Sequence, residues 1–184
     1  LGSSLRLKPN LQYRFKEMIN PLSLISLKNP WHLLATGFGS GLSPVVPGTM
    51  GTLASVPLFL LLAQLPFPLY VVAVLISCVI GIKICQVTSD DMGVHDHGSI
   101  VWDEFAGFWI TMSLVPALNI PLTEWKWLLT GFILFRFFDM VKPWPIGWLD
   151  KRVHGGLGIM IDDIVAGIMA GIALFFVAKY AGWM

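Results

Sequence analysis

A long stretch without any charged side chain restricts the fold of this protein more than any other feature of its sequence. Residues 29–82 contain no Asp, Glu, Lys or Arg, and 55% of the 184 residues are hydrophobic while only 12% are charged. The mean hydropathy is +0.73. This composition is typical of a protein embedded in a membrane. A soluble helical protein with an unusually apolar core is the alternative.

The N-terminal segment, residues 1–28, differs from the rest of the chain because it is basic. Its charged residues are Arg6, Lys8, Arg14, Lys16, Lys28 and a single acidic residue, Glu17. An amphipathic helix on an anionic membrane surface and a solvated tail are both open interpretations. Residues 29–184 are most simply one helical domain at this chain length. The net charge of +1 gives no indication of nucleic-acid binding.

The apolar segments predict an all-α, compact, membrane-embedded bundle of four to five helices. We expect these helices at about residues 52–65, 69–85, 105–122, 124–141 and 162–179. Several are shorter than the roughly 20 residues that span a bilayer core, so partial or tilted spans are expected. The glycines of the last helix form a small face, Gly167 to Gly171, that lets another helix approach closely.

A segment rich in glycine and proline, residues 37–52, precedes the first of these helices. So many glycines and prolines disfavour a helix, and the segment is therefore predicted to be a loop. At membrane depth such a loop must line a protein cavity or the interface, because its backbone groups need hydrogen-bond partners.

The distribution of charge favours one orientation in a membrane. If five spans alternate from a cytoplasmic N-terminus, all Lys and Arg residues except Lys126 and Lys179 lie on the cytoplasmic side, as the positive-inside rule expects. Every acidic residue except Glu124 lies there too. A polar face on an apolar bundle suits chemistry on a lipid headgroup. A transporter or channel more often carries charge in mid-span.

Two acidic pairs are the main candidates for a functional site. Asp103–Glu104 and Asp162–Asp163 each precede an apolar run, and Ala-Gly follows each pair. Clustered carboxylates repel one another unless a cation or protons neutralise them, and a set of oxygen ligands favours Mg²⁺. Together with Asp139, these four residues are the predicted metal ligands and catalytic residues. Alternatively, acidic residues at helix N-termini complement the helix dipole.

A second group of residues could bind phosphate. Arg136 and Asp139 are three residues apart on one helix face, and Lys142 directly precedes a proline that ends the helix. The guanidinium and ammonium groups can bind phosphate. Alternatively, Arg136 and Asp139 form an ion pair, and Lys142 extends its ammonium group towards the membrane interface. Thr49, at a helix start, and His154, before the second acidic pair, are weaker phosphate-binding candidates.

The remaining histidines and cysteines carry less information. His95 and His97 lie in the polar loop before the first acidic pair and could move protons. His32 is expected to be a hydrogen-bonded structural residue. Cys78 and Cys85 lie seven residues apart on one apolar helix, and we interpret them as buried thiols that form neither a disulfide nor a metal site.

Four segments together resemble the phosphatidylglycerophosphatase A family. They are NPWHLLATGFGSGLSPVVPGTMGT, MGVHDHGSIVWDEFAGFWIT, RFFDMVKPWPI and VHGGLGIMIDDIVAG. The resemblance covers nearly all of residues 29–178. It implies a bacterial inner-membrane enzyme that uses Mg²⁺ to remove the terminal phosphate of phosphatidylglycerophosphate, giving phosphatidylglycerol. It also implies an all-helical bundle, the fold of soluble relatives of this family.

The residues themselves narrow the chemistry of such a phosphatase. The sequence contains no Cys-x5-Arg loop, no Asp-x-Asp motif and no Ser/Arg/His set like that of the acid lipid phosphatases. Metal-assisted attack of water on a phosphomonoester remains. Which carboxylate activates the water stays open, and so does a covalent aspartyl-phosphate. The alternative functions are hydrolysis of another lipid phosphate, headgroup transfer, non-catalytic lipid binding and transport.

Overall fold

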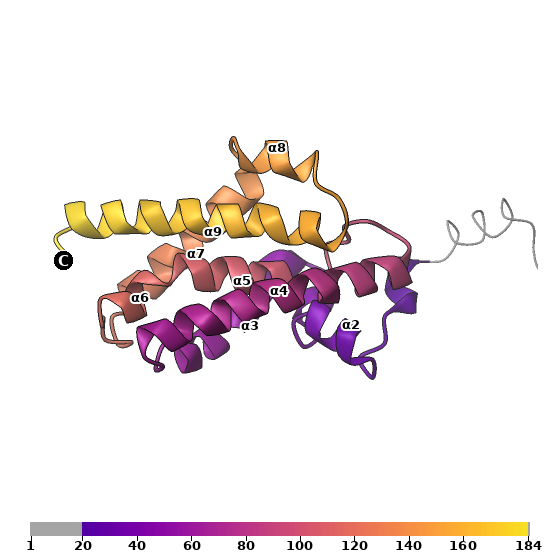
Figure 1. Ribbon diagram of the computed structural model, residues 1–184, viewed down its shortest axis with the longest axis horizontal. Helices are drawn as coiled ribbons and strands as arrows, with labels where there is room; N and C mark the ends of the chain where they lie inside the picture. The colour runs from indigo at the N-terminus through magenta and orange to yellow at the C-terminus, as the bar shows by residue number, and fades with distance from the viewer. Residues whose placement is uncertain (1–19, 184) are drawn as a thin grey trace, which may run out of the picture.

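The computed structural model describes residues 20–183, and this part of the chain is helical without any strand. The helices form an elongated bundle (Figure 1). In chain order they are η1 (Pro21–Leu24), α2 (Pro30–Ala35), η2 (Ser40–Leu42), α3 (Pro47–Leu62), α4 (Phe67–Met92), α5 (Trp102–Thr111), α6 (Leu114–Ala117), α7 (Trp125–Val141), α8 (Ile146–Asp150) and α9 (Gly155–Tyr180). The all-α prediction is confirmed. The predictions for residues 1–19 lie outside the described residues.

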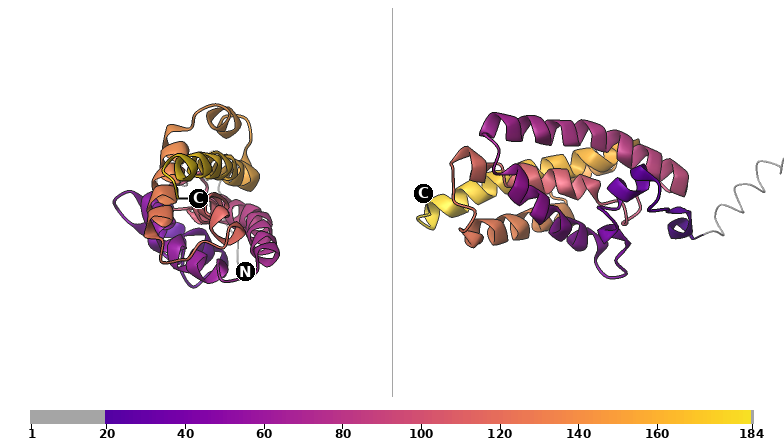
Figure 2. Two further views of the ribbon diagram at one scale, coloured as in Figure 1. Left: turned by 90° about the vertical axis from the view of Figure 1, so that its left-hand side faces the viewer. Right: turned by 90° about the horizontal axis from the view of Figure 1, so that it is seen from below.

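Helices α4 and α9 are the two described helices that are long and apolar enough to cross a membrane, each with 26 residues. Helix α3 is also apolar but has only 16 residues. Helix α9 runs in the same direction as α5 and opposite to α4, and it packs against α4, α5 and α7 (Figures 1 and 2). The expectation of four to five membrane helices stays a prediction.

Helices α3 and α9 begin earlier than the sequence predicted. The glycine-rich stretches before residues 52 and 162 are helical from Pro47 and Gly155 onwards, so the loop prediction was wrong over residues 47–52. A proline in the first turn suits a helix start. Glycine costs about 1 kcal/mol relative to alanine in a helix. Close packing requires it here, because a Cβ atom on Gly156 would lie 2.0 Å from the carbonyl oxygen of Ile82.

Helices α5 and α9 touch backbone to backbone, as the predicted small-residue face requires. A Cβ atom on Gly167 would lie 2.4 Å from the carbonyl oxygen of Gly107. The hydroxyl of Thr111 donates to the carbonyl oxygens of both Gly107 and Gly167, at 3.0 and 3.2 Å. This contact brings the two acidic pairs together, since each pair lies about one turn before its glycine.

The other predicted helices differ from the observed ones mainly at their ends. Helix α4 extends to Met92 and so includes a polar last turn, and the expected helix at 105–122 is divided into α5 and α6. Beneath the acidic residues the core is aromatic. The ring of Phe108 lies 6.0 Å from Phe59 and 6.3 Å from Phe135, measured between ring centroids, and all three rings are buried. This packing fixes α3, α5 and α7 relative to one another.

Candidate active site

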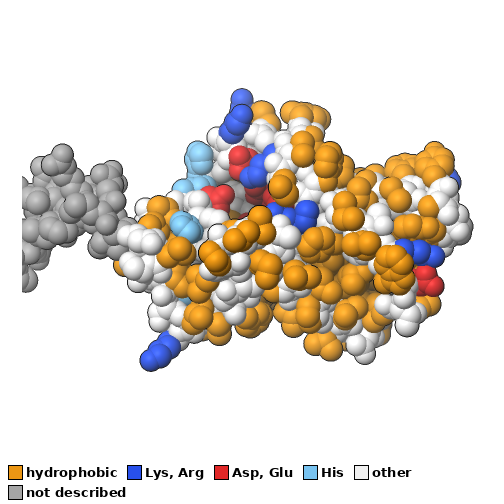
Figure 3. Space-filling view, turned by 180° about the vertical axis from the view of Figure 1, so that it is seen from behind, with side chains coloured by type: hydrophobic (Ala, Val, Ile, Leu, Met, Phe, Trp, Pro, Cys, Tyr) orange, Lys and Arg blue, Asp and Glu red, His pale blue; other side chains and the backbone are white. Residues whose placement is uncertain are grey.

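One hollow on the surface collects acidic and basic side chains, with histidines beside it, and apolar side chains surround it (Figure 3). Among the predicted site residues, five charged side chains come from three helices and from the residue that follows α7. They are Glu104, Arg136, Asp139, Lys142 and Asp162, and all five take part in ion pairs. Segments that are distant in sequence therefore meet in this one place.

Arg136 is the centre of the first ion-pair network. Its Nη1 atom lies 2.7 Å from Oδ2 of Asp139 and 3.2 Å from Oε1 of Glu104. The hydroxyl of Thr52 donates to Oε2 of Glu104 at 3.0 Å. A Cβ atom on Gly48 would lie 2.2 Å from Oε1 of Glu104, so the first turn of α3 packs directly against this carboxylate.

Lys142 is the centre of the second network. It caps the C-terminus of α7 in the left-handed conformation, with φ of 46°, directly before the proline that was predicted to end the helix. Its Nζ atom lies 2.6 Å from Oδ1 of Asp150 and 2.7 Å from Oδ2 of Asp162. Burial lowers the pKa of this ammonium group, but its hydrogen bonds to the two carboxylates outweigh burial and raise the pKa.

Three buried carboxylate oxygens in this region have no hydrogen-bond partner. They are Oδ1 of Asp103, Oδ1 of Asp162 and Oδ2 of Asp163. Burial and the neighbouring Glu104 raise the pKa of Asp103 well above its usual range. Burial also raises the pKa of Glu104, to about 7, although Arg136 opposes the shift. A buried carboxylate without a partner is costly, so this cluster needs a cation or protons.

The donor atoms of the cluster are of the type that binds a hard divalent cation, although they are not arranged as a complete coordination sphere. Within residues 20–183, no three His, Cys, Asp or Glu side chains are close enough together to hold a metal ion as they stand. The three unpartnered oxygens nevertheless supply the ligand type that Mg²⁺ prefers. Other carboxylate oxygens of Glu104, Asp139 and Asp162 are engaged in the ion pairs with Arg136 and Lys142.

The structure brings seven of the predicted site residues together, namely the five acidic residues, Arg136 and Lys142. The two weaker candidates are less engaged. Thr49 lies on the first turn of α3, and His154 precedes α9 with an exposed side chain. Neither side chain forms a hydrogen bond to another described residue, so their roles in phosphate binding stay predictions. The ring of His154 contacts that of His95, with 5.4 Å between centroids.

Two site residues were missed from the sequence. Thr52 holds Glu104, and Asp150 holds Lys142. The spacing of Thr52 four residues after Gly48 could have indicated a common helix face, had the segment been predicted as helical. Asp150 carried no such indication, because it reaches Lys142 only when α8, whose last residue it is, folds back over the end of α7. A second error concerned Asp162 and Asp163, which lie inside α9 and not at its N-terminus.

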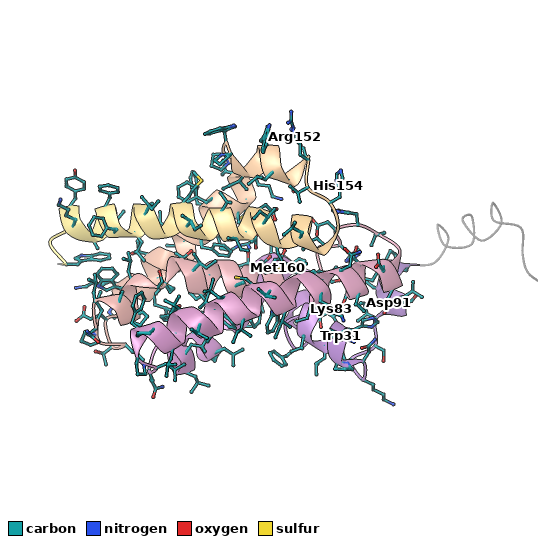
Figure 4. The ribbon with its side chains drawn as sticks, in the orientation of Figure 1. Trp31, Lys83, Asp91, Arg152, His154 and Met160 are labelled. Carbon is teal, nitrogen blue, oxygen red and sulfur yellow. The ribbon has the colours of Figure 1, made fainter. Side chains whose placement is uncertain are left out.

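The prediction for His32 is confirmed, whereas the prediction that both cysteines are buried holds only for Cys85. Nδ1 of His32 accepts a hydrogen bond from the Ser26 amide at 3.0 Å, and its Nε2 lies 2.9 Å from Oδ2 of Asp91. His32 is buried, and its contact with Asp91, which is labelled in Figure 4, ties α2 to the end of α4. Cys78 and Cys85 are both free thiols on α4, and Cys78 is partly exposed.

Comparison with known proteins agrees with this site. The family model described as phosphatidylglycerophosphatase A matches residues 33–178 and so includes every acidic residue of the candidate site. The chain belongs to the phosphatidylglycerophosphatase A family. Membership confirms the resemblance that the four sequence segments indicated. No solved structure matches the chain.

Two bacterial members of the phosphatidylglycerophosphatase A family are similar over most of their length. The protein of Escherichia coli K12 is 54% identical over 158 residues, which cover 86% of this chain and 89% of that protein. The protein of Haemophilus influenzae Rd is 50% identical over 157 residues, 85% of this chain and 93% of that protein. Both are named phosphatidylglycerophosphatase A, a phosphoric monoester hydrolase.

A third relative carries a different name. A Bacteroides thetaiotaomicron protein with the provisional name phosphatidylinositol-3-phosphatase is 38% identical over 158 residues, 83% of this chain and 93% of that protein. All three names describe phosphatases that act on a lipid phosphate.

Proposed function

We propose that this protein hydrolyses the terminal phosphate of phosphatidylglycerophosphate, with Mg²⁺, to phosphatidylglycerol and inorganic phosphate. One observation carries the proposal: three unpartnered carboxylate oxygens lie in a buried cluster beside two cationic side chains. The carboxylates suit a divalent cation, and the cations suit a phosphate dianion. The names of two relatives supply the substrate.

Asp103, Asp162 and Asp163 would hold the metal ion, with Glu104 or Asp139 completing the ligand set. Bound there, Mg²⁺ would neutralise phosphate charge and lower the pKa of a water molecule. A carboxylate of the cluster that does not bind the ion would orient the attacking water. The surrounding apolar core keeps this region at a low effective dielectric, which strengthens each charge–charge interaction in the site.

Arg136 and Lys142 would bind the phosphate oxygens. In the present arrangement their positive charges neutralise Glu104, Asp139 and Asp162. When an ion neutralises these carboxylates instead, the guanidinium and ammonium groups become available to the substrate. A guanidinium can bind two phosphate oxygens at once, and an ammonium group acts as a point charge. Thr52 keeps Glu104 in position during this exchange.

The distribution of charge along the bundle supports a proposal for its placement in a membrane. We propose that α4 and α9 cross the bacterial inner membrane and that the hollow faces the cytoplasm. Glu124, Lys126 and Lys179 belong to the opposite end of the bundle, where Lys126 pairs with Glu124 at 2.9 Å. The exposed apolar surface below the hollow would face acyl chains, so that a lipid substrate enters from the side (Figure 3).

Phosphate release from phosphatidylglycerophosphate in detergent micelles tests the proposal. We expect release with Mg²⁺, none with EDTA, and none from Asp163→Asn. Glu124→Gln is the matched control, because it removes a carboxylate of the exposed pair far from the hollow, and it should keep full activity. Release in EDTA at the rate seen with Mg²⁺ would refute the requirement for a metal ion. Full activity of Asp163→Asn would refute the location of the active site at this cluster.

A second substrate deserves the same assay because of the third relative. Phosphatidylinositol 3-phosphate also presents a phosphate monoester on a lipid headgroup, and the Bacteroides protein is named for its hydrolysis. We expect kcat/KM to be higher for phosphatidylglycerophosphate, since the relatives named for that substrate are more similar to this chain. A higher kcat/KM for phosphatidylinositol 3-phosphate would leave the proposed site unchanged but would assign it a different substrate.

A further inference from the structure

The segment that joins α7 to α9, residues 142–154, which we call the connector, is attached to the site by its inner side. The Gly147 amide donates to the carbonyl oxygen of Lys142 at 3.2 Å, and Ile146 is buried against the core. Asp150 binds the Lys142 ammonium. These contacts hold α8 over the end of α7, so the outer side of the connector has a defined direction.

The outer side of the connector combines aromatic and cationic side chains. Trp144 is 80% exposed and Trp148 is 47% exposed. Lys151 and Arg152 follow directly and are also exposed, and the Arg152 guanidinium lies 4.6 Å from the Trp148 ring centroid. Figure 4 shows Arg152 pointing away from the bundle. Exposed tryptophans beside basic residues are typical of the boundary between lipid headgroups and acyl chains.

No acidic residue within 20–183 neutralises the positive charge of this outer side. The acidic residue of the connector, Asp150, is engaged with Lys142. Among the salt bridges of residues 20–183, none involves Lys151 or Arg152. Exposed apolar side chains of Met140 and Val141 continue the surface onto the end of α7. An apolar surface that carries two exposed cations is complementary to an anionic lipid surface and not to a neutral one.

We propose that the outer face of the connector, formed by Trp144, Trp148, Lys151 and Arg152, binds anionic phospholipid at the membrane surface beside the active site. The tryptophans enter the interface and the two cations contact lipid phosphates or carboxylates. Because the inner side of the same segment holds Lys142, this contact sets the depth of the hollow relative to the layer of lipid phosphates. Lipid binding here requires no hydrolysis and is separate from the proposed reaction.

Fluorescence quenching by brominated lipids tests the proposal. The protein is placed in nanodiscs of phosphatidylcholine that contain a fixed fraction of either dibrominated phosphatidylserine or dibrominated phosphatidylcholine. The chain has eight tryptophans, so the difference between the protein and its Trp148→Phe variant isolates the signal of Trp148. We expect the serine lipid to quench this signal at least about threefold more than the choline lipid, given the attraction of basic residues to anionic lipid.

Two double variants with the same loss of charge provide the comparison. Lys151→Gln with Arg152→Gln should abolish the preference for the serine lipid, whereas Lys126→Gln with Lys179→Gln, at the other end of the bundle, should keep it. Asp163→Asn should also keep it, because the surface does not depend on turnover. Equal quenching by the two lipids, or a preference that survives loss of Lys151 and Arg152, would overturn the proposal.

Discussion

Helices α5 and α9 carry the same short motif, yet they hold their acidic residues differently. Asp103 and Asp163 each lie four residues before a glycine, and these glycines, Gly107 and Gly167, touch where the helices cross. The two helices run in the same direction (Figure 1). The two aspartates therefore occupy equivalent positions, and each has a buried oxygen without a partner.

The other acidic residue of each pair, Glu104 in α5 and Asp162 in α9, breaks this equivalence. In α5 it follows the shared aspartate as Glu104, which Thr52 and Arg136 hold. In α9 it precedes the shared aspartate as Asp162, which Lys142 holds. The difference teaches that the repeated positions carry aspartates with an unpartnered oxygen, which we propose bind an ion, whereas the variable positions connect each helix to a cation that we propose binds phosphate.

The largest effect is expected at the two equivalent aspartates. Asp103→Asn and Asp163→Asn should each reduce kcat/KM by about 100-fold or more, because an amide is a poor ligand for a divalent cation. The unfolding temperature without metal should stay equal or rise, since a buried unpaired charge is removed. Phosphate release and thermal unfolding in detergent measure both. An active variant at either position would show that the two helices are not equivalent.

The crossing of the two helices gives the next largest effect. Gly167→Ala should destabilise the protein by about 1–3 kcal/mol, because a methyl group cannot fit against the Gly107 carbonyl without moving a helix. Gly171→Ala is the matched control one turn further along α9, where the nearest atom lies 3.4 Å from the added Cβ. Denaturant unfolding compares them. Equal stability of the two variants would contradict the close backbone contact.

A change at Asp150 tests whether the network around Lys142 only stabilises the fold or also positions Lys142 for the substrate. Asp150→Asn should raise KM by about three- to tenfold with little change in kcat, since the partly exposed Lys142 would lose one of two carboxylates that hold it near the phosphate site. Asp150→Glu should restore part of the loss. Steady-state kinetics separates the two constants. A fall in kcat at unchanged KM would argue against a role in substrate binding.

Thr52 gives the smallest expected effect. It lies on α3 and holds the acidic residue Glu104 of α5. Thr52→Val should lower kcat/KM by less than about tenfold, because it removes one hydrogen bond to Glu104, worth about 1 kcal/mol. Thr52→Ser keeps the hydroxyl and should remain close to the original activity. Phosphate-release assays on both variants decide this. Equal losses in both would point to packing of the methyl group and not to the hydrogen bond.

The sequence alone was sufficient to predict the helical class, the acidic pairs and the two cations of the site. These features depend on local properties, since long apolar runs, breaks at prolines and clustered charge can be read along the chain. The i, i+3 spacing of Arg136 and Asp139 predicted their common face, and they form an ion pair at 2.7 Å. The approach of another helix to Gly167 was predicted for the same kind of reason.

Only the tertiary structure decided which residues meet across the bundle and where two helices begin. The glycines before Asp162 disfavour a helix locally, yet contacts with Ile82 and Gln86 leave room for no other residue and make this stretch the first turns of α9. Asp150 reaches Lys142 only because the connector turns back over α7. Such contacts join residues that share no periodic pattern, so their free energy appears only once the helices pack.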